Sequence, residues 1–366
     1  MKKVVCPYCS TEMQLRDCKV VSVVSGNILA DPKKSRPLFT TSIIGRKGVR
    51  ELASRQCVNP QCNKLLPRNI EFVDQNITIA IIGDTFSGKT HYIAALIEQL
   101  RSGRYLPPGY NLCLLNPASE EVAEIYERDY YQPMFQRSEI LQRSNKVFDE
   151  KAEPLIYELT LEGQIRKQVN LLIYDISGED LLNQRDFMSF RHHLLNAKGI
   201  LFMADPWAIA GFRNKLAHHL QPDPGQVTGR VVINVLHALA QLYQNNTGRS
   251  GRARLNIPVA LVITKADLIP YLTINPYFHD LYNPNFEHMM DIDNDSPVND
   301  VIHNLLQELD EPGLVRMVHR LEHARFFVTS ATGSNGDMNT GAYPLIKPYR
   351  CLDPLFWLLR ELRVFI

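Results

Sequence analysis

The stretch ITIAIIGDTFSGKTHYIAALIEQL runs from Ile77 to Leu100 and changes character at its centre. It opens with an apolar run, Ile77–Ile82, that has the length and the β-branched composition of a buried strand. It closes with apolar residues at the spacing of one helix face, namely Ile93, Leu96, Ile97 and Leu100. The pattern predicts a strand, a glycine-bounded loop and an amphipathic helix in direct succession.

The loop, GDTFSGKT at Gly83–Thr90, fits the pattern G-x-x-x-x-G-K-[ST]. Glycines let backbone N–H groups close around a phosphate, and the positive end of the helix dipole faces the same anion. Lys89 is placed to reach the β- and γ-phosphates, and the Thr90 hydroxyl is placed to hold Mg²⁺. We therefore predict a nucleotide site formed by Gly83, Asp84, Thr85, Phe86, Ser87, Gly88, Lys89, Thr90 and His91.

Beyond the loop, β-type runs alternate with helical patterns, which predicts an α/β fold of the P-loop type, with a mostly parallel sheet and helices on both faces. The expected strands are Ile77–Ile82, Leu155–Leu161, Val169–Tyr174, Gly199–Ala204, Val259–Thr264 and Arg325–Thr329. A hairpin signal at Glu162–Gln164 makes one strand antiparallel. An insertion at about residues 101–153 is expected to be helical, over Ser119–Tyr131 and Glu139–Phe148.

A D-x-x-G motif, Asp175–Gly178, follows one of these strands. A carboxylate at that position can hold the Mg²⁺ shell, and the N–H of Gly178 can contact a γ-phosphate. Ligands of open α/β sheets bind at the carboxyl ends of the strands, where this motif and the loop both lie. We therefore expect Thr90 and Asp175 to be the magnesium ligands.

The sequence TKAD at Thr264–Asp267 follows another expected strand. A buried Asp267 carboxylate can accept hydrogen bonds from the guanine N1–H and 2-amino group, a donor pair that adenine lacks. The Lys265 stem would cover the base, and a backbone N–H after the last strand could meet the guanine O6. The predicted guanine contacts are Thr264, Lys265, Asp267, Ser330, Ala331 and Thr332.

The four motifs GDTFSGKT, DISGED, TKAD and SAT together resemble the Ras-like, translation-factor-class P-loop GTPases over about residues 77–366. The long insertion and the paired N-terminal cysteines are also similar to the bacterial double-GTPase families associated with conflict and defence systems. The resemblance implies a Mg²⁺-dependent molecular switch that hydrolyses GTP to GDP and phosphate. It also implies a protein partner or activator that responds to the nucleotide state, with bacterial defence as one setting.

The resemblance implies catalytic roles for Lys89, Gly178 and Glu179, but Glu179 stands where many of these GTPases have a glutamine that orients the attacking water. A carboxylate accepts from water but cannot also donate. Glu179 therefore either positions water differently or is a solvated residue of a switch loop, and turnover is expected to be slow without a partner. The switch I threonine is not identifiable, and Ser144 is one candidate. Arg185, Arg191 or a partner's arginine could meet the transition-state charge.

Four of the seven cysteines form two close pairs, Cys6-x₂-Cys9 and Cys57-x₄-Cys62. Together they offer four thiolates to one tetrahedral Zn²⁺, which would staple an otherwise polar segment. A redox C-x-x-C and unlinked free thiols are the alternatives. We expect a small β-rich zinc ribbon at residues 1–73, with the stretch between the pairs as an inserted hairpin or loop, and a GTPase domain at residues 74–366. Basic residues of this segment, Arg55 among them, suggest nucleic acid, but aromatic residues are few and a protein docking module or structural cap is preferred.

Composition limits the partners further. The 366 residues carry a net charge of +1 and are 45% hydrophobic, so no overall charge draws the chain to nucleic acid or to an anionic membrane. No apolar run is long enough to span a bilayer, and the expected location is the cytoplasm. Two rival functions stay open: a nucleotide-locked interaction scaffold that does not hydrolyse, and an ATP-using P-loop enzyme, which would have no need for Asp267.

Overall fold

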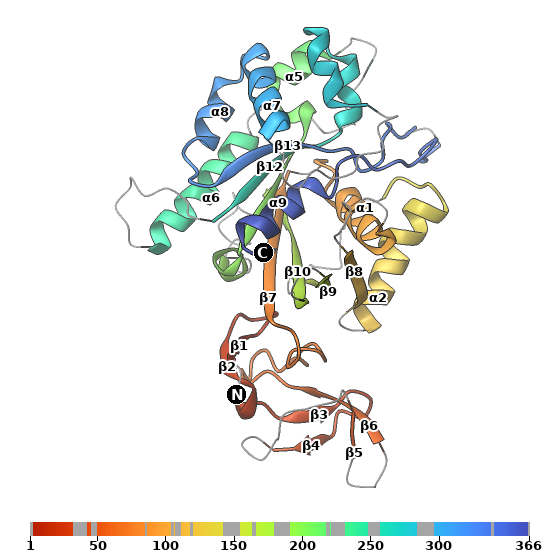
Figure 1. The fold of residues 1–366 in the computed structure, drawn as a ribbon, viewed down its shortest axis with the longest axis vertical. Coiled ribbons are helices and arrows are strands. Elements are labelled where there is room, and N and C mark those ends of the chain that lie inside the picture. The colour runs from red at the N-terminus through yellow and green to blue at the C-terminus, as the bar shows by residue number, and fades with distance from the viewer. Residues whose placement is uncertain are drawn as a thin grey trace.

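A computed structural model describes residues 3–31, 42–44, 50–84, 86–103, 106, 111–117, 120–141, 154–162, 166–178, 191–216, 220, 231–247, 257–283, 296–337 and 340–364. A small N-terminal module, defined as the described part of residues 3–73, leads through one long strand into a larger sheet covered by helices (Figure 1). Among the described residues, no helix is both long enough and apolar enough to cross a membrane.

The N-terminal module contains two antiparallel sheets. One pairs β1 (Lys3–Val5) with β2 (Glu12–Gln14). The other has the order β4-β3-β6-β5 and is formed by β3 (Val20–Ser22), β4 (Ile28–Ala30), β5 (Ser42–Ile44) and β6 (Arg50–Arg55). A short 3₁₀ helix, Leu15–Asp17, links the two sheets. The described part of the stretch between the two cysteine pairs therefore includes a sheet, where an inserted hairpin or loop was expected.

The larger sheet has seven strands in the order β13-β12-β11-β7-β10-β9-β8. Their bounds are β7 Gln75–Gly83, β8 Asn111–Pro117, β9 Leu155–Glu162, β10 Lys167–Ser177, β11 Gly199–Ala204, β12 Val259–Ile263 and β13 Ala324–Val328. β10, β7, β11, β12 and β13 are parallel, and β9 runs antiparallel to both of its neighbours. The six expected strands and the expected hairpin are confirmed.

Helices cover both faces of this sheet, as expected (Figure 1). Their bounds are α1 Lys89–Ser102, α2 Glu120–Tyr126, α5 Ala210–Lys215, α6 Val231–Thr247, α7 Ser296–Glu308, α8 Pro312–Val318 and α9 Asp353–Glu361, with 3₁₀ helices at Pro206–Ala208, Ala266–Tyr271 and Pro276–Leu281. α6, α7 and α8 pack on one face, and α1 and α9 pack on the other. β11 and β12 are buried along their whole length, which explains their unbroken apolar sequences.

The insertion differs from expectation in two ways. It begins with a strand, β8, that completes the edge of the sheet, and α2 continues into a π-helix, Glu127–Gln136. The helix expected over Glu139–Phe148 is wrong at its start, because residues 139–141 are extended and Glu139 pairs with Ala342. The remainder of that expected helix lies outside the described residues.

Candidate functional site

The phosphate-binding loop lies where three parallel strands end. Gly83 is the last residue of β7, and it pairs with Ser177 of β10 on one side and with Met203 of β11 on the other. A Cβ atom at Gly83 would lie 2.7 Å from the carbonyl oxygen of Met203, so a larger residue would collide with backbone. Gly88 begins α1 at φ +80°, in the left-handed region that favours glycine. The local geometry therefore explains why the motif has glycine at both positions.

Lys89 lies back along this loop. Its Nζ donates to the carbonyl oxygens of Gly83 (2.6 Å) and Asp84 (2.9 Å). The hydroxyl of Ser87 donates to the same Asp84 carbonyl at 2.7 Å. Phe86 is 42% exposed at φ 67°, and Thr85 lies outside the described residues. The Lys89 ammonium group thus lies against carbonyl groups of the loop. From there it can reach an anion that the loop amides bind.

The D-x-x-G segment lies against the loop. A Cβ at Gly178 would lie 3.3 Å from the carbonyl carbon and oxygen of Gly83, so the two glycines are close neighbours. Asp175 Oδ1 is buried and has no hydrogen-bond partner among the residues that the structure describes. Burial raises the pKa of the Asp175 carboxyl, and the charge of Lys89 lowers it in part. A buried carboxylate oxygen with a missing partner fits a divalent cation as its ligand.

Two of the predicted base-recognition residues, Asp267 and Ser330, come together from two loops. The Asp267 side chain, at the start of a 3₁₀ helix, is buried, and its Oδ1 accepts a 2.6 Å hydrogen bond from Ser330 Oγ. The Ser330 hydroxyl in turn accepts from the N–H of Gly333 at 2.8 Å. Burial raises the pKa of Asp267, and the Ser330 bond lowers it in part. Ser330 therefore fixes the orientation of the predicted guanine-binding carboxylate.

Asp205 also belongs to this site, although it was not predicted from the sequence. Lys265 has φ 52°, and its Nζ lies 3.0 Å from Asp205 Oδ2, whose side chain is 1% exposed. The hydroxyl of Thr264 donates to the carbonyl oxygen of Ala204 at 3.2 Å. Asp205 thus holds Lys265 beside β11. The available signal was its position directly after the buried strand Gly199–Ala204, at the edge where the other motifs lie.

The remaining predicted positions are only partly placed. Thr332 donates from its hydroxyl to the carbonyl of Ser334 at 2.8 Å, and Ala331 is partly buried beside the helix-covered core. Arg191 is the first described residue of a helical stretch, 191–196. Glu179, Ser144 and Arg185 lie outside the described residues.

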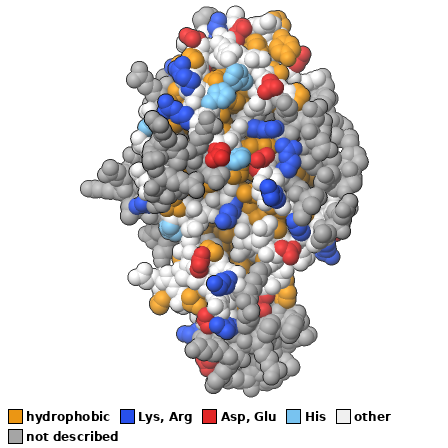
Figure 2. Space-filling model, turned by 60° about the vertical axis from the view of Figure 1, so that its left-hand side comes forward, with side chains coloured by type: hydrophobic (Ala, Val, Ile, Leu, Met, Phe, Trp, Pro, Cys, Tyr) orange, Lys and Arg blue, Asp and Glu red, His pale blue; other side chains and the backbone are white. Residues whose placement is uncertain are grey.

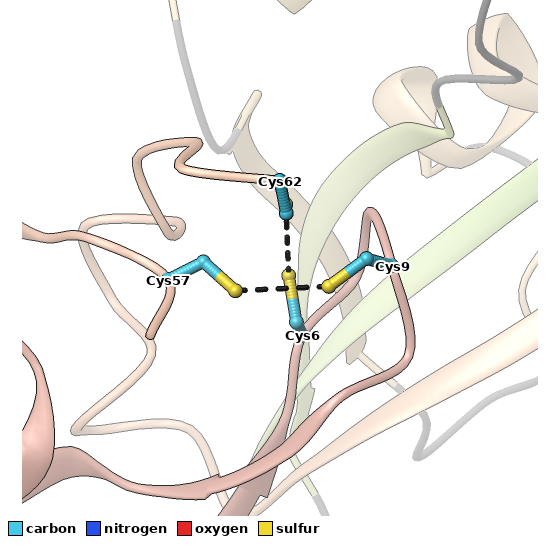
Figure 3. A group of neighbouring side chains, drawn as sticks. All are labelled: Cys6, Cys9, Cys57 and Cys62. Atoms are coloured by element: carbon cyan, nitrogen blue, oxygen red, sulfur yellow. Dashed lines mark hydrogen bonds between the residues drawn. The ribbon is translucent and has the colours of Figure 1, made fainter. Parts of the chain in front are cut away.

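The four paired cysteines form a second site, in the N-terminal module. Figure 3 shows their side chains pointing towards a common centre. The Sγ atoms of Cys6 and Cys62 are 3.9 Å apart, those of Cys9 and Cys57 are 3.6 Å apart, and all four lie within 4.8 Å of one another. Four sulfurs at about 2.3 Å from one Zn²⁺ would be about 3.8 Å apart. The cysteine cluster therefore fits a tetrahedral zinc.

Two similar turns present these thiols. In each turn the residue after the second cysteine has a positive φ, 56° at Ser10 and 51° at Asn63. The N–H of Tyr8 points at Cys6 Sγ (3.4 Å), as expected for an amide that stabilises a thiolate ligand. All six cysteines whose side chains the structure describes are free of disulfides. Both turns thus present free thiols in a backbone conformation that suits metal binding.

One basic residue of the module, Arg55, is enclosed by other residues of the protein. Arg55 is completely buried, where its Nε lies 2.5 Å from Glu71 Oε1 and its Nη1 donates to the Leu15 carbonyl. On the face shown in Figure 2, the coloured basic and acidic side chains are mixed and form no area of one sign. Since nucleic-acid affinity depends on accessible, clustered positive charge, the buried Arg55 does not contribute to such a surface.

The module contacts the larger sheet beside the D-x-x-G segment. The hydroxyl of Tyr174, one residue before Asp175, donates to the carbonyl oxygen of Pro7 in the first cysteine turn. The Tyr174 ring also stacks on His193, with 4.3 Å between centroids. Near the other ends of the strands, Asn69 Nδ2 donates to Asn170 Oδ1 at 2.7 Å. The first cysteine turn and the strand that leads into the D-x-x-G segment are therefore in direct contact.

Comparison with known proteins agrees with this geometry. A relative, described as "Putative ESX-1 scaffolding and assembly protein SaeC" from Mycolicibacterium smegmatis, is 25% identical over 324 residues, which cover 81% of this chain and 78% of the relative. The model of the Double-GTPase 2 family matches residues 77–341, the region that carries the P-loop, the D-x-x-G, TKAD and SAT motifs. This match confirms the double-GTPase resemblance. The chain belongs to the Double-GTPase 2 family.

Proposed function

We propose that this protein binds GTP with Mg²⁺, hydrolyses it to GDP and phosphate, and passes the difference between the two nucleotide states to a protein partner. The observation that carries the proposal is the buried Asp267 carboxylate, held by Ser330 on the same sheet edge as Lys89. A carboxylate buried there selects a base with two adjacent N–H donors, which guanine has and adenine lacks.

Each part of the site has a role in this proposal. The loop amides and Lys89 would stabilise charge on the β- and γ-phosphates, and the Gly178 N–H, next to Gly83, would contact the γ-phosphate. Thr90 and Asp175 would hold Mg²⁺, which when bound neutralises charge on the phosphate oxygens. Glu179 is proposed to position the attacking water.

The test is nucleotide binding to the full chain in the presence of Mg²⁺. GTP, GDP and ATP are titrated into the wild type and into Asp267→Ala. We expect the wild type to prefer guanine nucleotides by on the order of 100-fold or more, and Asp267→Ala to lose that preference. ATP binding as tight as GTP binding in the wild type would refute the proposal and favour an ATP-using enzyme.

A scaffold that keeps its nucleotide is the second candidate function. The printed description of the relative as a scaffolding and assembly protein favours it, and it suggests that the partner is a protein. Single-turnover hydrolysis of bound GTP separates the candidates, with the hydrolysis of free GTP in the same Mg²⁺ buffer as the reference. A wild-type rate above that reference supports a slow GTPase, and equal rates support the scaffold.

We further propose that residues 1–73 form a separate zinc-holding domain, with Cys6, Cys9, Cys57 and Cys62 as ligands. Two contacts of this domain support a structural or partner-binding role rather than nucleic-acid binding: the buried Arg55–Glu71 pair and the Tyr174–Pro7 bond. The cytoplasmic location and the role in bacterial defence stay predictions.

A further inference from the structure

The end of the insertion pairs with the long connection between β13 and α9. Glu139 and Ala342 form an antiparallel bridge. The N–H of Ile140 donates to the Gly341 carbonyl at 2.8 Å, and the N–H of Tyr343 donates to the Ser138 carbonyl at 2.7 Å. Two segments some 200 residues apart in sequence are thereby joined outside the main sheet.

The His91 ring ties this pair to the helix that follows the phosphate loop. Its Nε2 lies 3.0 Å from the N–H of Leu141 and 3.1 Å from the hydroxyl of Tyr343. Because a backbone amide can only donate, Nε2 must be unprotonated, and the Tyr343 hydroxyl then donates to the same nitrogen. The two rings also meet edge to face at 5.6 Å. We call this group of residues the clasp; it consists of Ser138–Leu141, Gly341–Tyr343 and the His91 ring.

The clasp is connected along the chain to both predicted ends of the nucleotide site. His91 directly follows Thr90, the proposed magnesium ligand. The β13–α9 connection begins at Ser330–Thr332, the proposed base-binding loop, and runs back towards α1 (Figure 1). Burial, with a smaller effect of the Lys265 charge, lowers the pKa of His91 to about 4. The His91–Tyr343 contact therefore joins α1, which follows the phosphate loop, to the connection that follows the proposed base-binding loop.

The clasp is also tightly packed. A Cβ atom at Gly336 would lie 2.7 Å from Cδ1 and 2.9 Å from Cγ1 of Ile140, and 3.0 Å from Cε1 of Tyr343. Glycine lets the connection approach Ile140 this closely without displacing the Ile140 and Tyr343 side chains. A single methyl group at position 336 should therefore push the two segments apart.

We propose that His91 is a positioning residue that ties the base-binding loop and the end of the insertion to α1, and so slows the release of guanine nucleotide. Release requires the phosphate side and the base side of the site to separate, and the clasp connects them. The inference rests on the proposed function, since it assumes that the nucleotide lies between Thr90 and Asp267.

The experiment measures release of a fluorescent GDP from the full chain after addition of excess unlabelled GDP. The variants are His91→Phe, which removes the acceptor, Tyr343→Phe, which removes one hydroxyl, and Gly336→Ala, which crowds Ile140. Tyr277→Phe, at a tyrosine that is 58% exposed, is the matched control. We expect release about tenfold faster for His91→Phe and Gly336→Ala, a few-fold faster for Tyr343→Phe, and unchanged for the control.

The double variant His91→Phe/Tyr343→Phe distinguishes the clasp from general loosening of the fold. If both residues act through Nε2, Tyr343→Phe should add little to His91→Phe, whereas independent damage would multiply the two effects. If the wild type binds guanine nucleotide and the variants release it at the wild-type rate, this inference is overturned while the proposed function stands. If the wild type binds no guanine nucleotide, both are overturned.

Discussion

At the scale of single residues, two carboxylates define the site, Asp175 and Asp267. Burial raises the pKa of both, so each is ionised at some cost to the fold. Ser330 offsets part of that cost at Asp267 with a 2.6 Å hydrogen bond, whereas Asp175 Oδ1 has no partner in the described part of the chain. Such an uncompensated group is expected where a ligand completes the site.

Asp175→Asn should therefore separate stability from function. The substitution removes a buried charge, so we expect the nucleotide-free protein to become more stable by about 1 kcal/mol. The same change should abolish the Mg²⁺ dependence of GTP binding, because a carbonyl oxygen replaces the charged ligand. Urea unfolding and Mg²⁺ titration of the same preparation measure the two effects. A less stable nucleotide-free variant would show that Asp175 has a structural role instead.

His193 predicts a pH dependence of stability. The ring is 4% exposed and stacks on Tyr174. Burial, with a smaller effect of His192, lowers the pKa of His193 to about 3. In the unfolded chain the group takes up a proton near pH 6.5, so below that pH the unfolded state binds more protons. Stability from this residue is therefore complete above about pH 6.5 and is lost progressively towards pH 3.

We expect the free energy of unfolding to fall by about 1 kcal/mol more in the wild type than in His193→Phe between pH 7.5 and 5.5. Comparing the two proteins in the same buffers removes contributions that they share, such as loss of a metal in acid. Equal changes in the two proteins would mean that His193 is already solvated in the folded state.

At the scale of elements, the N-terminal module depends on its cysteine turns. β1 and β2 are three residues each, and the core around the cluster is small. Short strands with so little apolar burial need a staple, and metal binding supplies it. We expect one zinc per chain in the wild type and none in Cys57→Ser.

Cys18→Ala is the control for that measurement, since Cys18 is a buried thiol of the same module outside the cluster. It should keep its zinc while losing some stability. Removal of zinc by a chelator should increase amide hydrogen exchange in β1 and β2 before it affects the seven-stranded sheet. Zinc retained in Cys57→Ser would exclude the four-thiolate site.

The elements also show what the sequence could predict and what it could not. The P-loop strand and helix, the D-x-x-G strand and the TKAD strand were predictable because each combines a local period with a motif at a fixed offset. β8, with sequence NLCLLNP, is a short apolar run between turn residues, and periodicity cannot distinguish it from a buried helix segment. Glu139–Leu141 was predicted helical, but tertiary pairing with Gly341–Tyr343 overrides the local preference.

Side-chain partners were predictable only where a motif implied them. The Asp267–Ser330 bond fits two motifs that were expected to meet at one base. The contacts of His91 with Leu141 and Tyr343 join three separate segments, and no spacing in one sequence records them. Asp205 was predictable in principle, because it is a carboxylate at the end of a strand, but it belongs to none of the recognised motifs.

At the scale of the whole molecule, Tyr174 links the N-terminal module to the nucleotide-binding sheet. Tyr174→Phe removes the hydroxyl that bonds to Pro7 and keeps the ring that stacks on His193. We expect a loss of about 1 kcal/mol in unfolding free energy and a faster loss of zinc to a chelator. Tyr243→Phe removes a similar buried hydroxyl bond, to the carbonyl of Leu194, which is not part of the module. It should destabilise the fold without changing zinc release, and equal zinc release from both variants would contradict the link.

The central claim is that Asp267 reads guanine. The most direct test is the base preference of the wild type and of Asp267→Asn, measured with GTP, xanthosine triphosphate and ATP in Mg²⁺. Xanthine has a carbonyl oxygen where guanine has its 2-amino group, so an asparagine amide can donate to it while still accepting from N1–H. The account predicts that the wild type prefers GTP and that Asp267→Asn prefers xanthosine triphosphate. An unchanged order of affinities in Asp267→Asn, or a wild type that binds ATP as well as GTP, would contradict it.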